Sequence, residues 1–155
     1  MNNKNILNSS LEFGLRVVVL LAEFENTALN LDQILKYDYL MTNSGEFDER
    51  YPSLHPETPY RYSRLLVKRE AFKEGIEQMC KNGLINIEFT SGGICYQKNK
   101  FTGIFLNNLN SNYKCKLVQR ANWIANEIHT DERKTVIKEL NNRISRCGIE
   151  FYREG

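Results

Sequence analysis

Hydrophobic positions in the first part of the chain recur at helical spacing and predict two helices. The apolar side chains of the first helix form one broad stripe: Leu11, Leu15, Val17, Val18, Leu20, Leu21, Ala22 and Phe24. Ser9 and Glu12 fit a capping box at its start, because a serine can bond the backbone N–H three residues ahead. A second helix is predicted from Asn30, with Gln33 at the reciprocal position, to residues 40–41. A stripe this broad indicates that its neighbours largely enclose the first helix.

From residue 42 to residue 63 neither helical nor strand periodicity survives, and all three prolines of the chain lie here: Pro52, Pro56 and Pro59. Structureless loops of this length are uncommon inside compact domains. The segment is dense in aromatic and other binding side chains, among them Phe47, Tyr51, Leu54, His55, Tyr60, Arg61 and Tyr62. Disordered linkers are poor in aromatic residues, so we predict an ordered loop.

A third helix is predicted over residues 67–82, closed by Gly83 at the position after the cap. Its inward side chains would be Phe72, Ile76 and Met79. Apolar and polar residues then alternate over 85–89 and again over 94–96, on either side of Ser-Gly-Gly at 91–93. Alternation around a glycine turn predicts a β-hairpin.

The C-terminal third predicts further helices. A short helical piece is expected over 101–109, and a final helix from Thr130 or Asp131 to a stop at Gly148. A longer helix between them would present Tyr113, Leu117, Ala121, Ile124 and Ile128, with Trp123 off that stripe. The final helix would present Ile137, Leu140, Ile144 and Cys147.

Three helices, the third running into a hairpin, follow the order of elements in a winged-helix unit. We therefore predict a mainly α (α+β) fold with one β-hairpin and additional C-terminal helices. A length of 155 residues corresponds to about one domain, here 1–155. Within it, a winged-helix-like part would cover 9–98, including the ordered proline-rich loop 42–63, and a C-terminal helical part would cover 101–148.

The net charge of +2 excludes a polybasic protein but hides a gradient along the chain. Residues 1–50 carry four basic and eight acidic groups, residues 51–100 eight and five, and residues 101–155 nine and six. This uneven distribution of charge bears on which partners the protein binds rather than on how it folds. Neither a membrane-spanning apolar stretch nor a secretory signal is recognisable, so we expect a cytoplasmic location and no membrane contact.

Cysteine and histidine usage predicts neither a metal site nor a cofactor. Cys80, Cys95, Cys115 and Cys147 form no Cys-x-x-Cys pair, which zinc sites and redox dithiols require. We expect these four side chains to be small buried apolar groups.

Two function classes, a DNA-binding regulator and an enzyme, are weaker candidates than a docking module. At or near one flank of the predicted third helix lie Arg64, Lys68, Arg69, Lys73 and Lys81. The same helix also carries Glu70, Glu74 and Glu77, and the hairpin tip has no cation. A phosphate-tracking surface concentrates positive charge, so a winged-helix transcriptional regulator stays as the alternative.

No glycine-rich phosphate loop or nucleophile elbow is present, and we predict no enzyme. The only catalytic pairing that the sequence suggests is His55 with Asp48 or Glu57, and spacing alone gives it no geometry.

Several short motifs, taken in order, resemble the middle component of bacterial ABC-three-component systems. They are 11–16 (Leu-Glu-Phe-Gly-Leu-Arg), Asp38-Tyr39, 44–46 (Ser-Gly-Glu), 53–56 (Ser-Leu-His-Pro) with Pro59, and 67–70 (Val-Lys-Arg-Glu). Weaker likeness continues through Gly83-Leu84, Tyr96 and 120–123 (Arg-Ala-Asn-Trp). The segment 62–64 (Tyr-Ser-Arg) departs from the pattern, because a carboxylate would be expected there.

The resemblance implies an accessory subunit without activity of its own, as in Lamassu-type anti-phage defence. Its partners would be an SMC-like ABC ATPase and an effector subunit, often a nuclease, which the complex would hold inactive. Any contact with DNA is expected only within that complex.

Arginine and tyrosine are enriched in interface hot spots, and arginine pairs with carboxylates in a bidentate manner. We therefore predict a partner-binding set: Tyr51, Leu54, His55, Tyr60, Arg61, Tyr62, Arg64, Lys68 and Arg69. The other interpretation, that the loop packs on its own domain, is compatible with this one.

Overall fold

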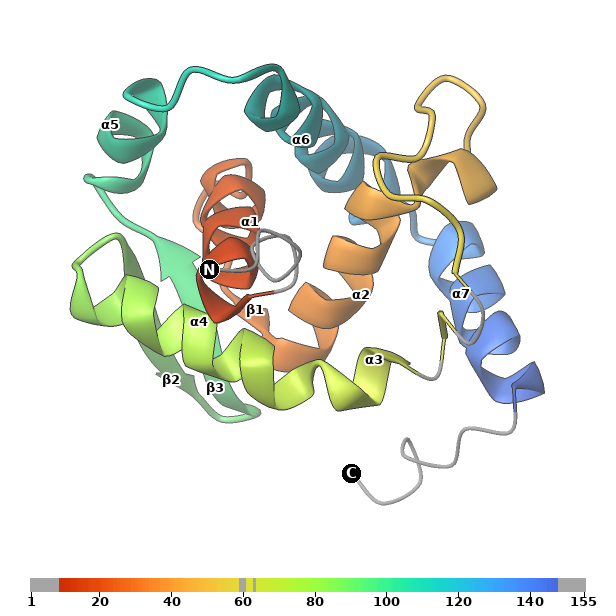
Figure 1. Cartoon of the computed structure of the whole chain (residues 1–155). Coiled ribbons are helices and arrows are strands. Elements are labelled where there is room, and N and C mark those ends of the chain that lie inside the picture. The colour runs from red at the N-terminus through yellow and green to blue at the C-terminus, as the bar shows by residue number, and fades with distance from the viewer. Residues whose placement is uncertain (1–8, 59–60, 63, 148–155) are drawn as a thin grey trace.

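The computed structural model describes residues 9–58, 61–62 and 64–147, and it confirms the mainly helical α+β class (Figure 1). The elements in chain order are α1 (Ser10–Ala22), β1 (Leu29–Asn30), α2 (Leu31–Thr42), the 3-10 turn η2 (Ser44–Glu46), α3 (Arg64–Val67), α4 (Arg69–Lys81), β2 (Ile85–Thr90), β3 (Gly93–Lys98), α5 (Thr102–Asn107), α6 (Asn112–Trp123), the π-helical turn η3 (Ile124–Ile128) and α7 (Thr135–Arg146).

The first two helices begin at the predicted caps. Ser9 Oγ accepts a hydrogen bond from the Glu12 N–H at 3.2 Å, and Asn30 and Gln33 form a complete capping box at 2.9 and 3.0 Å. These bonds satisfy backbone N–H groups that have no partner within the helix. Leu11 was wrongly placed on the buried stripe, since 56% of it is exposed.

Helix α1 is the central element of the fold, as its broad stripe predicted. Figure 1 shows it surrounded by α2, α4, α5 and α6. Five consecutive residues are buried, namely Val17, Val18, Val19, Leu20 and Leu21. This arrangement buries α1 on nearly every side, so a polar residue within it must find its partner inside the protein.

The third helix is divided in two rather than continuous. Helix α3 ends at Val67, which is 78% exposed, and α4 begins at Arg69. Phe72, Ile76 and Met79 of α4 are buried as predicted. Gly83 follows the C-cap with φ at +73°, a conformation that favours glycine.

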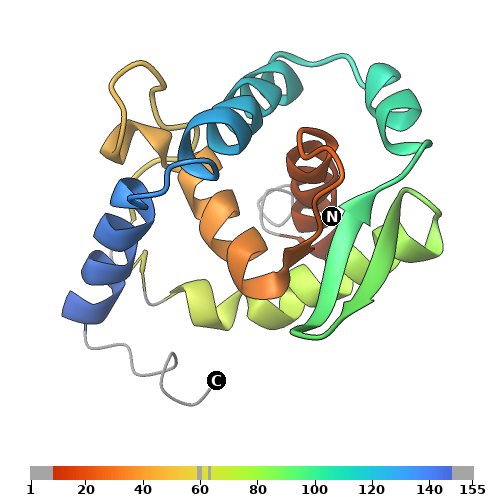
Figure 2. The same ribbon diagram turned by 180° about the vertical axis from the view of Figure 1, so that it is seen from behind.

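The predicted hairpin is present and belongs to a three-stranded antiparallel sheet of order β1-β3-β2 (Figure 2). Strand β1 escaped sequence analysis because it has only two residues, which pair with Tyr96 and Cys95. Helix α1, strand β1, helices α2 to α4 and the hairpin follow one another in the order expected of a winged-helix unit. The winged-helix likeness remains an interpretation.

The C-terminal helices follow the prediction with two corrections. Trp123, predicted to lie off the stripe, is 4% exposed and packs against Tyr51, while Ile124 and Ile128 of the stripe are buried as predicted. Helix α7 starts at Thr135, since the Asp131 carboxylate instead accepts the N–H groups of Arg133 and Thr135. The predicted stop at Gly148 lies outside the described residues.

The cysteines were wrongly predicted as buried. Cys115 and Cys147 are exposed, and Cys80 and Cys95 are half-buried. Cys80 still packs against the edge of the core, so small size alone did not decide how deeply each cysteine lies. In the described part of the chain, no helix is long and apolar enough to cross a membrane.

Candidate docking pocket

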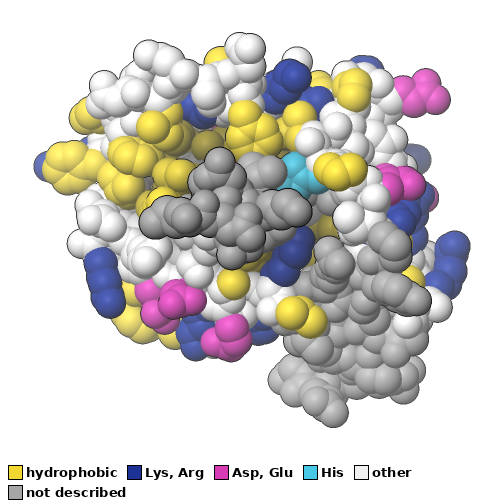
Figure 3. All heavy atoms as spheres, in the orientation of Figure 1, with side chains coloured by type: hydrophobic (Ala, Val, Ile, Leu, Met, Phe, Trp, Pro, Cys, Tyr) yellow, Lys and Arg dark blue, Asp and Glu magenta, His cyan; other side chains and the backbone are white. Residues whose placement is uncertain are grey.

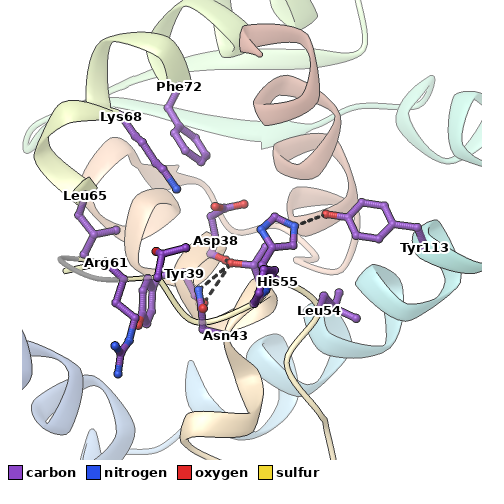
Figure 4. A pocket seen from close by; sticks show the side chains of 13 residues that line it. Asp38, Tyr39, Asn43, Leu54, His55, Arg61, Leu65, Lys68, Phe72 and Tyr113 are labelled. Carbon is purple, nitrogen blue, oxygen red and sulfur yellow. Dashed lines mark hydrogen bonds between the residues drawn. The ribbon is translucent and has the colours of Figure 1, made fainter. Parts of the chain in front are cut away.

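A pocket of about 380 Å³ lies where α2, the loop after it, α4 and α6 meet (Figure 4). Its lining combines apolar and polar side chains: Asp38, Tyr39, Thr42, Asn43, Leu54, His55, Pro56, Thr58, Arg61, Leu65, Lys68, Phe72 and Tyr113. Pockets of this mixed character are usual at ligand and partner sites.

A buried ion pair lies next to the pocket and holds one of its walls in place. Arg16 of α1 donates from Nε to Asp38 Oδ1 at 2.7 Å and from Nη2 to Oδ2 at 2.9 Å. The two residues are 1% and 5% exposed, and the Arg16 guanidinium lies over the rings of Phe13 and Phe72. Burial alone would lower the pKa of Arg16, but the Asp38 charge and hydrogen bonds raise it. The pair ties α1 to α2 and fixes one pocket wall.

His55 and Tyr113 form the wall between the loop and α6. His55 Nε2 lies 2.8 Å from the Tyr113 hydroxyl, and the rings are stacked. Burial and the positive charge of Arg16 lower the pKa of His55 to about 4, and burial raises the pKa of Tyr113 to about 12. The hydrogen bond therefore joins two uncharged groups at neutral pH. The backbone N–H of His55 also bonds to the Thr42 carbonyl at the end of α2.

Glu46 gathers a cluster of donors at the rim of the pocket. Its carboxylate accepts hydrogen bonds from Arg61 Nε at 2.8 Å and from the hydroxyls of Tyr39 and Tyr62 at 2.5 and 3.2 Å. Arg143 of α7 lies 3.8 Å from the same carboxylate and bonds the Tyr62 hydroxyl. The cluster joins the loop to α2 and to α7.

Arg120 of α6 fixes the loop from the other side. It is 4% exposed, and it donates to the Pro52 carbonyl at 2.6 Å and to Ser44 Oγ at 3.2 Å. Tyr51 packs on Trp123, with ring centroids 5.3 Å apart. The described loop residues are thus ordered against the domain, as the density of aromatic residues predicted.

The structure brings four residues of the predicted partner-binding set together in the pocket: Leu54, His55, Arg61 and Lys68. Tyr62 lies beside them in the Glu46 cluster, whereas Tyr51 lies against α6 and Arg69 pairs with Asp32 at 2.5 Å on the surface. Tyr60 and the side chain of Arg64 lie outside the described residues.

Sequence reasoning missed Arg16, Asp38 and Tyr113 as parts of this site. An arginine within the apolar stripe of α1 was a signal, since a buried arginine requires a carboxylate partner. The carboxylate is 22 residues away in sequence, so only the fold identifies it.

The suggested catalytic pairing of His55 is not found in the pocket. Asp48 accepts a hydrogen bond from Arg50 at 2.7 Å, Glu57 lies 3.9 Å from Arg61, and His55 bonds Tyr113. Among the residues that the structure describes, no group of histidine, cysteine and carboxylate side chains could hold a metal ion. The pocket is a preformed concave surface whose charged side chains are paired with one another. Such a surface is suited to binding a partner or ligand.

We expect the contribution of His55 to the stability of the fold to fall as the pH drops from about 6.5 toward about 4, because His55 is neutral when folded. The unfolded chain binds a proton at the ordinary pKa of 6.5, whereas the folded chain binds it only near 4, so protonation favours unfolding within that window. Urea unfolding at a series of pH values measures this slope. His55→Gln is expected to flatten it.

His129→Gln is the matched comparison, since burial and Lys134 also lower the pKa of His129. Burial raises the pKa values of Glu12 and Glu23, which act in this window with the opposite sign, but the parent chain and both variants share them, so the difference between curves isolates the histidine. A His55→Gln curve parallel to that of the parent chain would show that His55 has no part in the acid sensitivity.

Arg61 and Arg69 are expected to differ in their effect on stability. Arg61→Ala removes a donor from a Glu46 side chain that is 8% exposed and should cost about 1–2 kcal/mol. Arg69→Ala breaks a pair exposed by 42% and 60% and should cost less than about 1 kcal/mol. Thermal unfolding of both variants tests this, and equal losses would contradict it.

No match is found among curated proteins or among solved structures. Residues 6–150 match the family described as ABC-three component (ABC-3C) system Middle Component 2. The matched range includes the pocket, the Glu46 cluster and the hairpin. The chain therefore belongs to the Middle Component 2 family of ABC-three-component systems.

Proposed function

We propose that the protein is a non-catalytic accessory subunit of an anti-phage defence complex. It would bind an SMC-like ABC ATPase and help to hold a nuclease-type effector inactive. The observation that carries this proposal is the family match over residues 6–150, because a middle component works with the other components of its system.

The pocket and its rim supply the docking surface in this proposal. Arg120, Glu46 and the His55–Tyr113 contact hold the loop in place before any partner arrives. A preformed surface avoids the entropy cost of ordering a loop on binding. Support for an acidic anchor on the partner comes from Lys68, whose side chain extends into the pocket beside Asp38 (Figure 4).

Hydrophobic contact area is available elsewhere on the surface. Figure 3 shows hydrophobic side chains gathered beside α5, where Phe101 and Ile104 are 50% and 62% exposed. Exposed apolar groups of this kind often belong to protein interfaces. A subunit placed between two partners needs more than one such surface.

Co-expression of the full chain with the products of the neighbouring genes tests the proposal. We expect a complex with the ATPase and the effector that survives gel filtration. Lys68→Glu should weaken it at least about tenfold, as expected for an interfacial charge reversal. Lys73→Glu, on the exposed side of helix α4, whose N-cap is Lys68, is the matched control and should bind normally.

A chain that elutes apart from both gene products would overturn the proposal. The alternative, a winged-helix transcriptional regulator, predicts binding to upstream DNA with a steep salt dependence. Exposed Glu70, Glu74 and Glu77 on α4 disfavour it, since this helix would face the phosphates. Gel-shift titration at low salt separates the two functions.

A further inference from the structure

The hairpin presents an open strand edge. In the sheet order β1-β3-β2, strand β2 has a neighbour among the described residues only on its β3 side, and every residue of β2 after Ile85 is exposed (Figure 2). The other side of such a strand offers backbone N–H and C=O groups to a further strand. Proteins usually protect edges with proline, bulges or inward-pointing charges. Strand β2 contains no proline, and its pairing with β3 has no bulge.

One face of this edge is apolar. Ile87, Phe89 and Ile94 are 43%, 82% and 52% exposed. The register pairs Phe89 with Ile94 and Ile87 with Tyr96, so all four side chains lie on the same face of the hairpin. Glu88, the charged residue of β2, points to the opposite face and makes no ion pair within the described residues. The apolar face is therefore left without a charge on β2 to repel another strand.

We propose that β2 pairs antiparallel with β2 of a second copy of this chain, about a two-fold axis at Ile87. This register places Ile87 opposite its symmetry mate and Phe89 opposite Ile85. The two apolar faces then form one continuous surface, and Glu88 lies opposite Asn86 on the other side. Two-fold pairing needs a strand that is complementary to itself, and β2 has this property.

Other registers of the same pairing are less favourable. A shift that puts the axis at Glu88 sets two carboxylates directly opposite each other, which is destabilising. A shift by one position pairs Ile87 with Glu88 and moves one apolar face to the wrong side of the sheet. The register centred on Ile87 avoids both faults.

The expected dimer is weak. Two six-residue strands form an interface at the small end of the range for specific complexes, so we expect a dissociation constant on the order of micromolar. Sedimentation equilibrium of the full chain, from about 1 µM to about 500 µM, should show a reversible monomer–dimer equilibrium. Phe89→Lys should weaken it at least about tenfold by placing a charge on the apolar face. Thr90→Lys, on the opposite face of β2, is the control and should dimerise.

Disulfide trapping tests the register. With Cys115 and Cys147 replaced by serine, Ile87→Cys should cross-link to its symmetry mate under a mild oxidant, because directly opposed residues lie within disulfide reach. Asn86→Cys, which would face Glu88 of the second copy and pairs with Gln97 within its own hairpin, should not. A monomer at every concentration, or a dimer indifferent to Phe89→Lys, would overturn the proposal. The proposal is also overturned if the chain is monomeric and the hairpin variants lose only their co-elution with another component. The β2 edge would then be a contact with that component.

Discussion

Asp38→Ala is expected to destabilise the fold by about 3–5 kcal/mol, the largest loss among the substitutions considered. The change leaves the Arg16 guanidinium buried with 1% exposure and without the carboxylate that accepts two of its hydrogen bonds. Glu12, whose carboxylate lies 3.6 Å from Arg16 Nη1, stays as an acidic partner, but it offsets only part of the cost of a buried charge that has lost two short hydrogen bonds. Chemical denaturation monitored by circular dichroism measures the loss.

Asp32→Ala is the matched control on the same helix. Its carboxylate is 60% exposed and pairs with Arg69 at the surface, so the expected loss is below about 1 kcal/mol. The double variant Arg16→Met with Asp38→Leu removes both charges and should recover much of the stability lost in Asp38→Ala. A loss below about 1 kcal/mol in Asp38→Ala would show that Arg16 finds another partner or water.

The elements predicted correctly from sequence are those fixed by neighbouring residues. Caps at Ser9 and Asn30 depend on groups three positions apart, and the hairpin depends on alternation around a turn. The division between α3 and α4 was missed, because helical periodicity alone continues through Lys68. Strand β1 was missed because two residues show no period.

The pocket could be predicted only in part. The loop supplied Leu54 and His55 as candidates because aromatic and proline density marked it as ordered. Arg16 and Tyr113 came from helices whose patterns suggested only packing. Tyr113 lines the pocket and Arg16 acts on it through Asp38, both by contacts distant in sequence. Arg61 was expected to face a partner, yet the fold gives it an internal carboxylate, Glu46. Residue type indicates the capacity to bind, whereas the fold decides which partner is near.

Gly75→Ala is expected to destabilise the fold by about 2–3 kcal/mol, although alanine is the better helix former. Helices α1 and α4 cross closely at Gly14 and Gly75. A methyl group at residue 75 would overlap the backbone carbonyl of Ser10 and lie 2.8 Å from the Gly14 nitrogen. Both obstacles are backbone atoms, so relief requires the helices to move apart. Since α1 is the central helix, this shift would disturb the packing around Phe13 and Phe72, whose stacked rings join the same two helices.

Gly103→Ala is the matched control, because a methyl group there meets no atom within 4 Å and lies in helix α5. It should leave stability unchanged or raise it by up to about 1 kcal/mol. Thermal unfolding should therefore separate the two variants by about 5–10 °C for a domain of this size. Equal midpoints would mean that α1 and α4 can separate at little cost, and the close crossing would then not fix the pocket between α2 and α4.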